Sequence, residues 1–543
     1  HCRWDKDCVS IAQGNILTTL QREYDHLNRM RRLIDGEGNA SQYDYDLSGN
    51  LLKSISPSGH ASGYHYDALH RLQRMSDALQ GQTRFEYDRH GRLTGVEDAN
   101  QAQTSYHYDG FGNLLTQNSA DTGMTTHQYD LAGNRLLTTD ARGITVQYQY
   151  DVLNRLIMVG YPDSQHDATL SYDQGEHGMG RLTAINEPHV RLGFGYDARG
   201  YLSHQRQELM QQSLAVSYQH DRAGNLTGLG YPSGLQVQYQ RDDRGRVGEV
   251  QAWRQDGQPI PLATDIQYQP FGGLQSLQYG NGITLTREYD RAGRLTRHRE
   301  HPVHDLRFGY DADGNLVSRT MPHGAEYYGY DALQRLQSAS GGFGQREYQY
   351  DPVGNRLQRT ANGIHEVGTT EYVYQSASNR LLQAGGVQYH YDNAGNPLSI
   401  GDLVHRYDDR NRLQSILHND QALAEYRYNL LGQRVAKILP DNGAAQAEWH
   451  RQQAALAEAE AARLSTVLIA LELDQAMLEA QRQAALNRAD SARQQADAQR
   501  NQAATLQQQA ETLDARADQH RAAAQQYQQQ AEDALASRLS GLL

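Results

Sequence analysis

Carboxylates and histidines are the residues of this sequence that could carry chemistry. The chain contains 64 Asp and Glu residues, and paired carboxylates can act as general acid and base. His298, His301 and His304 form the single cluster of histidines, whose imidazoles could ligate a metal ion. Pro302 interrupts this segment and breaks the helical spacing that would place the three rings on one face. We therefore expect no metal site there.

Other signatures of catalysis or cofactor binding are missing from the sequence. It contains no Gly-Lys pair for a phosphate-binding loop and no H-E-x-x-H, G-x-S-x-G or C-x-x-C motif. Cys2 and Cys8 can form one small clasp or remain free thiols, but two cysteines alone do not complete a four-ligand zinc site. We therefore predict no catalytic, cofactor-binding or metal-binding residue, and no enzymatic activity.

The composition is that of a folded chain without a large dry core. Hydrophobic residues make up 38 % of the 543 positions, and 35 Tyr stand against 6 Phe. The net charge of −13 and the presence of only three lysines disfavour nucleic acid and acidic membranes as partners. The sequence contains no run of about 18 apolar residues, so we expect no membrane-spanning helix. The chain does not begin with Met, so we expect any targeting signal to lie outside it.

The elements that position these side chains follow from an internal repeat. Tyr-Asp pairs recur every 21 residues from Tyr24 to Tyr150, then less regularly to Tyr428. We count 20 copies of Y-D-x-x-G-N/R-L, in which Tyr holds its place in 18, Asp follows in 17, and Gly or Asn stands four residues after the first position in 16. This recurrence predicts one structural unit repeated along residues 16–438.

Each motif position has a physical reason, as the copy at Tyr108–Leu114 illustrates. Asp109 can accept hydrogen bonds from the backbone ahead of it, Gly112 suits a positive φ, and Leu114 starts the returning strand. A second turn lies between copies, so each unit holds two short strands, and 20 units predict roughly 40 strands. Because neighbouring strands twist by about 20–25°, such a ribbon must coil around a hollow. The alternative is a β-propeller of about ten blades, more than the usual 4–8.

The motif resembles the YD repeat of the Rhs family, which includes bacterial Rhs effectors, toxin-complex components and teneurins. The resemblance covers residues 16–438 and implies a mainly β protein with a long, spiralling antiparallel sheet that forms a hollow shell. In the toxin members the shell encloses a variable C-terminal toxin and ends in a self-cleaving D-P-x-G-L segment. Here Asp351-Pro352-Val353-Gly354-Asn355 is an ordinary repeat turn, and no D-P-x-G-L follows Tyr428. The resemblance therefore does not extend to self-cleavage or toxin release.

A segment of different composition follows the repeats. After a lead-in (1–15), the repeats (16–438) and a linker (439–443), residues 444–543 are rich in Ala, Gln, Arg, Glu and Leu, which favour helix. The residues 444–540 lack Gly and Pro. An alanine recurs every seven residues, and this pattern predicts a coiled-coil tail that pairs with another copy or with itself. Two alternatives are a lone helix packed on the ribbon and a segment that is only partly helical. The stripe consists of Ala489, Ala496, Ala503, Ala510, Ala517, Ala524 and Ala531.

These features lead to one main functional hypothesis and one rival. The main hypothesis is a non-enzymatic shell or scaffold of a bacterial secreted or delivered toxin-type protein, which encloses or presents a cargo polypeptide. The rival is a cell-surface adhesion or filament protein, with the repeats as a spacer and the helical tail as an assembly element. A toxin activity in the tail is a weaker third reading, since an Ala/Gln-rich helix offers no nucleophile, base and pocket.

Overall fold

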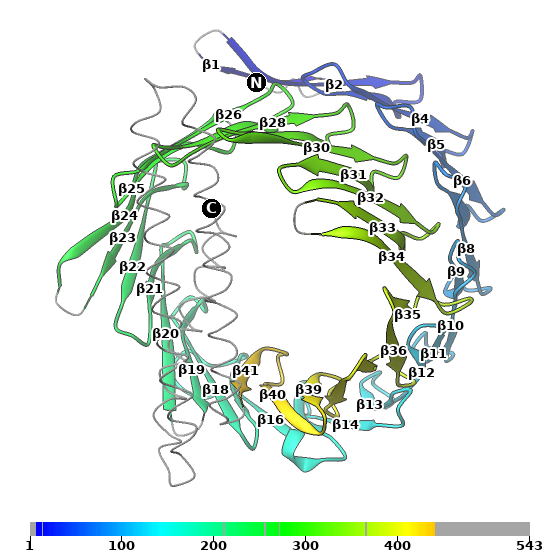
Figure 1. Cartoon of the computed structure of the whole chain (residues 1–543). Helices are drawn as coiled ribbons and strands as arrows, with labels where there is room; N and C mark the ends of the chain where they lie inside the picture. Colours follow the sequence, from blue (N-terminus) through cyan, green and yellow to red (C-terminus); the bar gives the residue numbers. More distant parts are fainter. Residues whose placement is uncertain are drawn as a thin grey trace. The chain divides into compact units, whose positions relative to one another are not determined.

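The computed structural model describes residues 7–12, 15–209, 212–254, 257–270, 272–363 and 366–439, which form 41 β-strands of one sheet and one short 3-10 helix (Figure 1). The expected repeat region is thus built of strands, and their number agrees with the roughly 40 expected from 20 units. Cys2, the linker from residue 440 onward and the predicted helical tail at 444–543 lie outside the described residues.

The strands are short and evenly spaced. The first group is β1 (Asp7–Ala12), β2 (Asn15–Tyr24), β3 (Met30–Ile34), β4 (Ala40–Tyr45), β5 (Leu51–Ile55), β6 (Ala61–Tyr66), β7 (Leu72–Ser76), β8 (Gln82–Tyr87), β9 (Leu93–Glu97), β10 (Gln103–Tyr108), β11 (Leu114–Ser119), β12 (Gly123–Tyr129), β13 (Arg135–Thr139), β14 (Thr145–Tyr150) and β15 (Leu156–Gly160), followed by the 3-10 helix (Ser164–His166). The second group is β16 (Ala168–Tyr172), β17 (Leu182–Asn186), β18 (Val190–Tyr196), β19 (Leu202–Leu209), β20 (Gln212–His220), β21 (Leu226–Gly230), β22 (Gln236–Arg241), β23 (Val247–Trp253), β24 (Pro259–Tyr268), β25 (Leu274–Tyr279), β26 (Thr284–Tyr289) and β27 (Leu295–His301). The third group is β28 (His304–Tyr310), β29 (Leu316–Met321), β30 (Gly324–Tyr330), β31 (Leu336–Gly341), β32 (Gly344–Tyr350), β33 (Arg356–Asn362), β34 (Val367–Tyr374), β35 (Leu381–Ala384), β36 (Val387–Tyr391), β37 (Pro397–Ile400), β38 (Leu403–Tyr407), β39 (Leu413–His418), β40 (Gln421–Tyr428) and β41 (Arg434–Ile438).

The sheet is a meander: from β1 to β38 each strand pairs antiparallel with the next one in the chain, and β39 pairs likewise with β40. In a typical hairpin, Tyr106 of β10 lies opposite Gln117 of β11, and a β-bulge before Tyr108 places Tyr108 opposite Leu114. The same bulge recurs before the motif residue at Tyr45, Tyr129 and many other copies. Because turns alternate between the two edges of a meander, all turns within motif copies lie on one edge, here called the YD edge. The turns between copies lie on the opposite edge, here called the return edge.

The YD turn has the predicted geometry. In the copy at β10 and β11, the Asp109 carboxylate accepts the N–H groups of Phe111 at 2.9 Å and Asn113 at 2.8 Å. The backbone closes the turn with Asp109 N–H to Asn113 O at 3.0 Å, and Gly112 has φ +95°. Asparagine takes the positive φ where glycine is replaced, for instance at Asn28 and Asn154. The assignments of Asp as turn opener and Gly or Asn at positive φ are confirmed.

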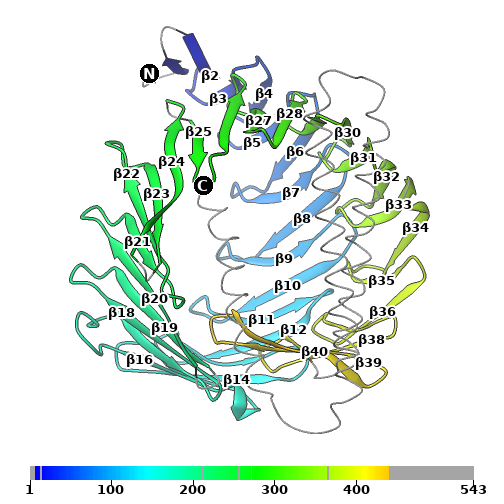
Figure 2. The ribbon, with the colours of Figure 1, turned by 60° about the vertical axis from the view of Figure 1, so that its left-hand side comes forward.

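The described residues divide into two units, which are best considered separately. The first comprises the residues up to Gln414 together with 428–435, and the second contains residues 415–427 and 436–439. In the first unit the ribbon coils as an open spiral, so β5–β15 lie beside β29–β38 (Figure 2). A propeller would consist of separate small sheets, one for each blade, whereas these strands belong to one sheet. The propeller alternative is therefore wrong. In the second unit, β39 pairs with β40 from Ser415↔Glu425 to His418↔Gln421.

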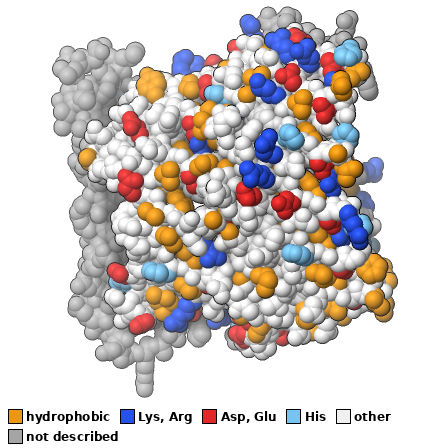
Figure 3. All heavy atoms as spheres, turned by 90° about the vertical axis from the view of Figure 1, so that its right-hand side faces the viewer, with side chains coloured by type: hydrophobic (Ala, Val, Ile, Leu, Met, Phe, Trp, Pro, Cys, Tyr) orange, Lys and Arg blue, Asp and Glu red, His pale blue; other side chains and the backbone are white. Residues whose placement is uncertain are grey.

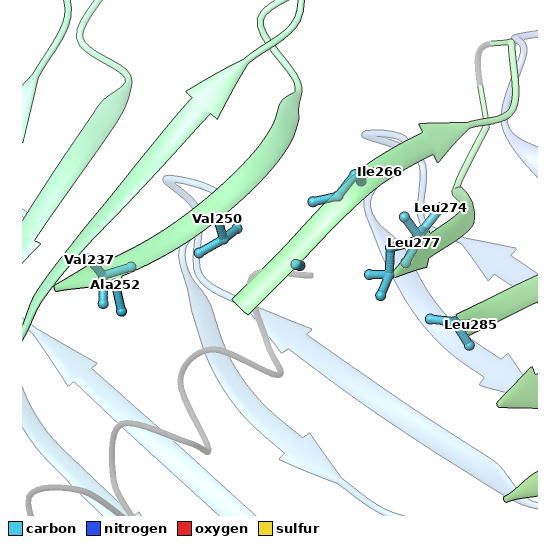
Figure 4. Close-up of a cluster of buried hydrophobic side chains, with 8 residues drawn as sticks. Val237, Val250, Ala252, Ile266, Leu274, Leu277 and Leu285 are labelled. Carbon is cyan, nitrogen blue, oxygen red and sulfur yellow. The ribbon is translucent and has the colours of Figure 1, made fainter. Parts of the chain in front are cut away.

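Apolar burial is concentrated in one part of the ribbon. Eight buried side chains of β22–β26 form a cluster, in which Val237 lies opposite Ala252 and Leu277 opposite Leu285 (Figure 4). Figure 3 shows the face that lies on the right-hand side of Figure 1. On this face hydrophobic, acidic and basic side chains are interspersed. This distribution agrees with the small dry core expected from the composition.

Replacing Gly112 by Val should destabilise the first unit by about 1–3 kcal/mol, because a β-branched side chain is strained at positive φ. The matched control is Gly110→Val in the same turn. A Cβ added at either glycine has no atom closer than 4.0 Å, but only Gly112 has a positive φ. The free energy of unfolding from urea titration is the measurement. Equal values for the two variants would contradict the turn assignment.

Candidate functional site

The tyrosine of most motif copies links two consecutive repeats through its hydroxyl group. Tyr108 donates a hydrogen bond to the carbonyl oxygen of Leu93, the last motif position of the preceding copy, at 2.9 Å. The same bond joins Tyr87 to Leu72 at 2.9 Å and Tyr289 to Leu274 at 2.7 Å. Phenylalanine could fill the same volume but could not donate this bond. The preference of the repeat for Tyr therefore reflects a repeat-to-repeat hydrogen bond.

Arginine at the sixth motif position makes a second link between the same two repeats. Arg92 bonds its own turn aspartate, with Nε 2.6 Å from the Asp88 carboxylate. Its other nitrogen, NH1, donates to the carbonyl oxygen of Asp109 in the next copy at 2.7 Å. The guanidinium also lies over the ring of Tyr108, 4.9 Å from the ring centroid. One arginine thus joins the aspartate of its own turn to the Tyr-Asp pair of the following turn.

This Asp–Arg–Tyr clasp recurs along the ribbon, and we call the series the repeat ladder. Guanidinium-to-centroid distances in it range from 4.5 Å to 5.9 Å. Copies with Asn instead of Arg retain the intra-turn bond, as between Asn113 and Asp109 at 2.8 Å. The Arg–Tyr contacts are Arg29–Tyr45, Arg71–Tyr87, Arg92–Tyr108, Arg155–Tyr172, Arg181–Tyr196, Arg246–Tyr268, Arg294–Tyr310, Arg335–Tyr350, Arg380–Tyr391 and Arg412–Tyr428.

The ladder sets the charge state of its aspartates. Desolvation alone would raise the pKa of Asp88, but hydrogen bonds from the Arg92 backbone and guanidinium and from His90 N–H lower this pKa to about 2. At Asp67 the largest cause of the lowered pKa is the Arg71 backbone N–H. Burial acts in the opposite direction on the phenol and raises the pKa of Tyr108. Asp67 and Asp88 therefore stay ionised and Tyr108 stays protonated at neutral pH.

A second set of contacts joins residues about 250 positions apart in the first unit, where one circuit of the coil meets the next. The YD edge of the later circuit docks on the return edge of the earlier circuit, and we call this contact the seam. Asp313 of the later circuit accepts Ser58 N–H at 3.0 Å, and its carboxylate lies 3.4 Å from His60 Nδ1. Asn100 donates to Asp351 at 2.7 Å and to Asn379 at 3.1 Å.

The seam is polar along its length. Asp121 accepts the Asn379 N–H and the Ser378 hydroxyl, both at 2.7 Å. Arg142 donates to the carbonyl oxygen of Asp408 at 2.8 Å. Burial would raise the pKa of Asp121, but the bonds from Asn379 and Ser378 keep it below its ordinary value. The docking of successive circuits therefore rests on ionised carboxylates, amides and backbone groups.

A buried ion pair terminates the seam. Arg410 NH2 lies 2.7 Å from the Glu187 carboxylate, and the two side chains are 4 % and 3 % exposed. Glu187 also accepts Leu430 N–H at 3.0 Å, and the Arg410 guanidinium lies over the Tyr161 ring at 5.3 Å. Because removal of one partner of a buried pair leaves an uncompensated charge, this contact is the most sensitive point of the seam.

A cavity of about 1000 Å³ opens on the seam between the return turns at residues 77–81 and 98–101 and the later circuit. Two ionisable groups in its lining already have partners, because Glu97 pairs with Arg84 at 3.4 Å and Arg335 with Asp331 at 2.7 Å. The cavity is therefore bordered by side chains with structural roles.

The residues considered for chemistry are not brought together into a site. His298 and His301 project from opposite faces of β27 because side chains alternate along a strand. His298 contacts Glu300 at 3.3 Å, whereas His301 contacts Arg299. No group of three or more His, Cys, Asp or Glu that could hold a metal ion occurs among the described residues, and within them no helix is long and apolar enough to cross a membrane. The Asp351 turn is an ordinary repeat turn, as predicted, with Gly354 at φ +101°.

The sequence matches the family described as Teneurin YD-shell over residues 13–167 and 325–448, together more than half of the chain. The chain belongs to the YD-shell family. This membership confirms the resemblance to YD-repeat and Rhs proteins.

Relatives and solved structures of the YD shell agree with this assignment. The chain is 31 % identical over 214 residues to a probable deoxyribonuclease RhsB of Dickeya dadantii and 26 % identical over 331 residues to the toxin protein Tse5 of Pseudomonas aeruginosa. These matches cover 35 % and 54 % of this chain and 14 % and 25 % of the two relatives, so the chain spans a quarter or less of their length. The fold resembles the Photorhabdus luminescens Tc holotoxin pore at a TM-score of 0.69 and 18 % identity, over 78 % of this chain and 26 % of that one. TcdB2-TccC3 gives a TM-score of 0.66 at 18 % identity, over 80 % and 29 %.

The role of arginine in the ladder was not recognised from the sequence of the YD shell. The motif position was read as Asn or Arg beside the turn, without a partner in the next copy. The signal was present, since Arg recurs there, 16 residues before the next Tyr in five of the ten pairs, and Tyr outnumbers Phe 35 to 6. The seam gave no such signal because its partners are about 250 residues apart.

Acid should weaken the YD shell in a defined window. The folded pKa of Asp88 is about 2 against an ordinary 3.8, so its contribution to stability is complete above pH 3.8 and is lost as the pH falls through about 2. Asp88→Asn should lower the free energy of unfolding at neutral pH and reduce the further loss on acidification. Asp243→Asn, an exposed aspartate beside turn residue Asp242, is the matched control and should keep the wild-type profile. Parallel urea titrations from neutral to acid pH provide the measurement, and identical pH profiles for Asp88→Asn and wild type would contradict the ladder electrostatics.

Proposed function

We propose that this YD shell is a non-enzymatic container or scaffold of a bacterial secreted or delivered toxin-type protein. The observation that carries the proposal is the seam, which joins successive circuits of the ribbon. Through these contacts the circuits form one continuous wall. Polar contacts from Ser58–Asp313 to Glu187–Arg410 hold this wall together over half a circuit or more. A ribbon that served only as a linear spacer would have no need of them.

The chemistry of the ribbon supports a structural role. Most aspartates of the motif are turn acceptors or ladder partners, and the phenol groups bond backbone carbonyls. No pair of groups with the roles of nucleophile and base emerges from the described residues. The relatives are bacterial proteins, and the names of two include toxin, which supports a delivered toxin-type protein. The enzymatic activities that relatives' names state, such as deoxyribonuclease, belong to proteins far longer than this chain.

We propose that the cargo is a polypeptide held by the shell, either the segment 444–543 or another tethered chain. The adhesion or filament reading differs from this proposal in one physical respect. In it the tail extends from the ribbon to join other copies, and its backbone is available to solvent. Protection of the tail therefore separates the two functions.

Limited trypsin digestion of the full chain tests the proposal. Residues 444–543 contain many arginines, so an exposed tail is cut quickly, whereas an enclosed tail should be cut at least about tenfold more slowly than the isolated segment. Arg410→Ala should open the seam and abolish the protection, because it leaves Glu187 buried and unpaired, at a cost of about 3–5 kcal/mol. The control Arg410→Met/Glu187→Leu replaces the pair by apolar side chains and should retain the protection. Equal cleavage rates for the tail in the full chain and alone would favour the adhesion or filament function.

A further inference from the structure

The YD edge of the first circuit, from β2 to β17, carries a row of exposed apolar side chains. Each projects from the tip of a YD turn, and successive tips lie two strands apart, about 10 Å. Their exposed fractions range from 54 % to 104 %. We call this row the apolar rim. It consists of Leu27, Leu47, Leu69, Phe111, Leu131, Val152, Leu153 and Met179.

Several turn tips carry polar side chains where the YD edge is docked. In the second circuit the tips that enter the seam include Asp313, Ser378 and Arg410, which bind polar groups of the return edge. Docked turns can also carry an apolar tip, as at Val353 and Leu430, but these turns bind the return edge through polar groups, the Asp351 carboxylate and the Leu430 N–H. The tips of the first circuit differ in being mostly apolar and strongly exposed, so an apolar partner would remove this row of side chains from water.

We propose that the apolar rim is a two-fold symmetric interface between two copies of this chain. The coil advances by one ribbon width in each circuit of about 250 residues, as the seam shows, so its edge follows a helical path. A two-fold axis perpendicular to the coil axis maps a helical path onto itself and places the second body on the other side. Two identical rims can thus meet along their whole length, which is the self-complementarity of an isologous interface.

The order of the tips fits this symmetry. Eight turns occupy the rim, and an axis between the fourth and the fifth brings Leu27 opposite Met179, Leu47 opposite Val152 and Leu69 opposite Leu131. It brings the fourth turn, with Arg89 and His90 at its tip, opposite the fifth, with Phe111. The only turn without an apolar tip thus faces an exposed aromatic ring, a pairing that allows a cation–π contact. In each of the four pairs of turns that the axis relates, the two tips have compatible side chains.

The area of the rim is sufficient for a stable dimer. Exposed side chains of this size each offer on the order of 100–150 Å², so eight of them offer on the order of 1,000 Å², against about 800 Å² per partner in a standard interface. A flat bilayer fits less well. The rim extends over more than half of a circuit and rises by on the order of 10 Å, so a planar surface reaches only part of it.

Sedimentation velocity of the full chain over a series of micromolar concentrations tests the proposal. Wild type should dimerise, and Leu47→Ser/Leu69→Ser/Leu131→Ser should weaken the dimer at least ~100-fold because central apolar contacts dominate interface energies. The matched control is Val303→Ser/Val367→Ser, which removes exposed apolar side chains from the return edge of the second circuit and should leave the dimer unchanged. All five positions are exposed, so the fold should be retained, and circular dichroism monitors this.

A residue exchange tests the symmetry itself. Phe111→Arg should abolish dimerisation, since it places two cations against each other in both halves of the interface. Arg89→Phe/Phe111→Arg restores the cation–aromatic pair with its partners exchanged and should recover the dimer. Recovery supports the two-fold register, and failure of the exchange to recover the dimer contradicts it.

Three further outcomes would overturn the proposal. The first is a wild-type chain that is monomeric throughout the series. The second is a dimer that persists in the triple rim variant, which would locate association elsewhere, for instance in residues 444–543. The third is flotation of wild-type monomers with phosphatidylcholine vesicles that is lost in the rim variant, which would identify a lipid surface as the partner.

Discussion

Across the described residues the ribbon is a single sheet without a second layer against which to bury side chains, and this constraint governs the repeat region. Stability must therefore come from contacts along the chain, between one repeat and the next. The repeat ladder provides them, because an arginine such as Arg92 is bonded to its own turn aspartate and to the Tyr-Asp pair of the following turn. The tyrosine hydroxyl closes the same junction from the other strand. A regular sequence is needed because the clasp works only when successive turns are in register.

The seam depends on the ladder in turn. Successive circuits can meet only if the curvature is nearly constant, which requires each junction to have nearly the same geometry. Many partners are then separated by about one circuit, 255 residues for Ser58 and Asp313 and 251 for Asn100 and Asp351. The tips of the YD turns are free of duties in the ladder, so they can vary. Polar tips such as Asp313, Ser378 and Arg410 make contacts in the seam, whereas most tips of the first circuit are apolar and exposed.

Much of this architecture could be predicted from the sequence, because the repeat is local. The motif at Tyr108–Leu114 indicated the strands, the turn, the role of Asp109 and the positive φ of Gly112, and its recurrence gave the coil and the approximate strand number. The bonds of Arg92 and Tyr108 to other copies could not be derived from one motif copy, since their acceptors lie in a neighbouring repeat. The Glu187–Arg410 pair was beyond prediction for a stronger reason. Its partners are 223 residues apart and meet only because the accumulated twist of many strands brings one circuit beside another.

Successive circuits of the coil meet at the seam, and a disulfide engineered across the seam would report this contact. Asn100→Cys/Asn379→Cys in a Cys2→Ser/Cys8→Ser background places two thiols where the amide groups now lie 3.1 Å apart. Oxidation should give an intramolecular disulfide, visible as a compact band on a non-reducing gel. The control Asn100→Cys/Asn225→Cys uses the equivalent position of a copy about half a circuit away and should stay reduced. The same outcome for both pairs, or a disulfide only between separate molecules, would contradict the coiled arrangement.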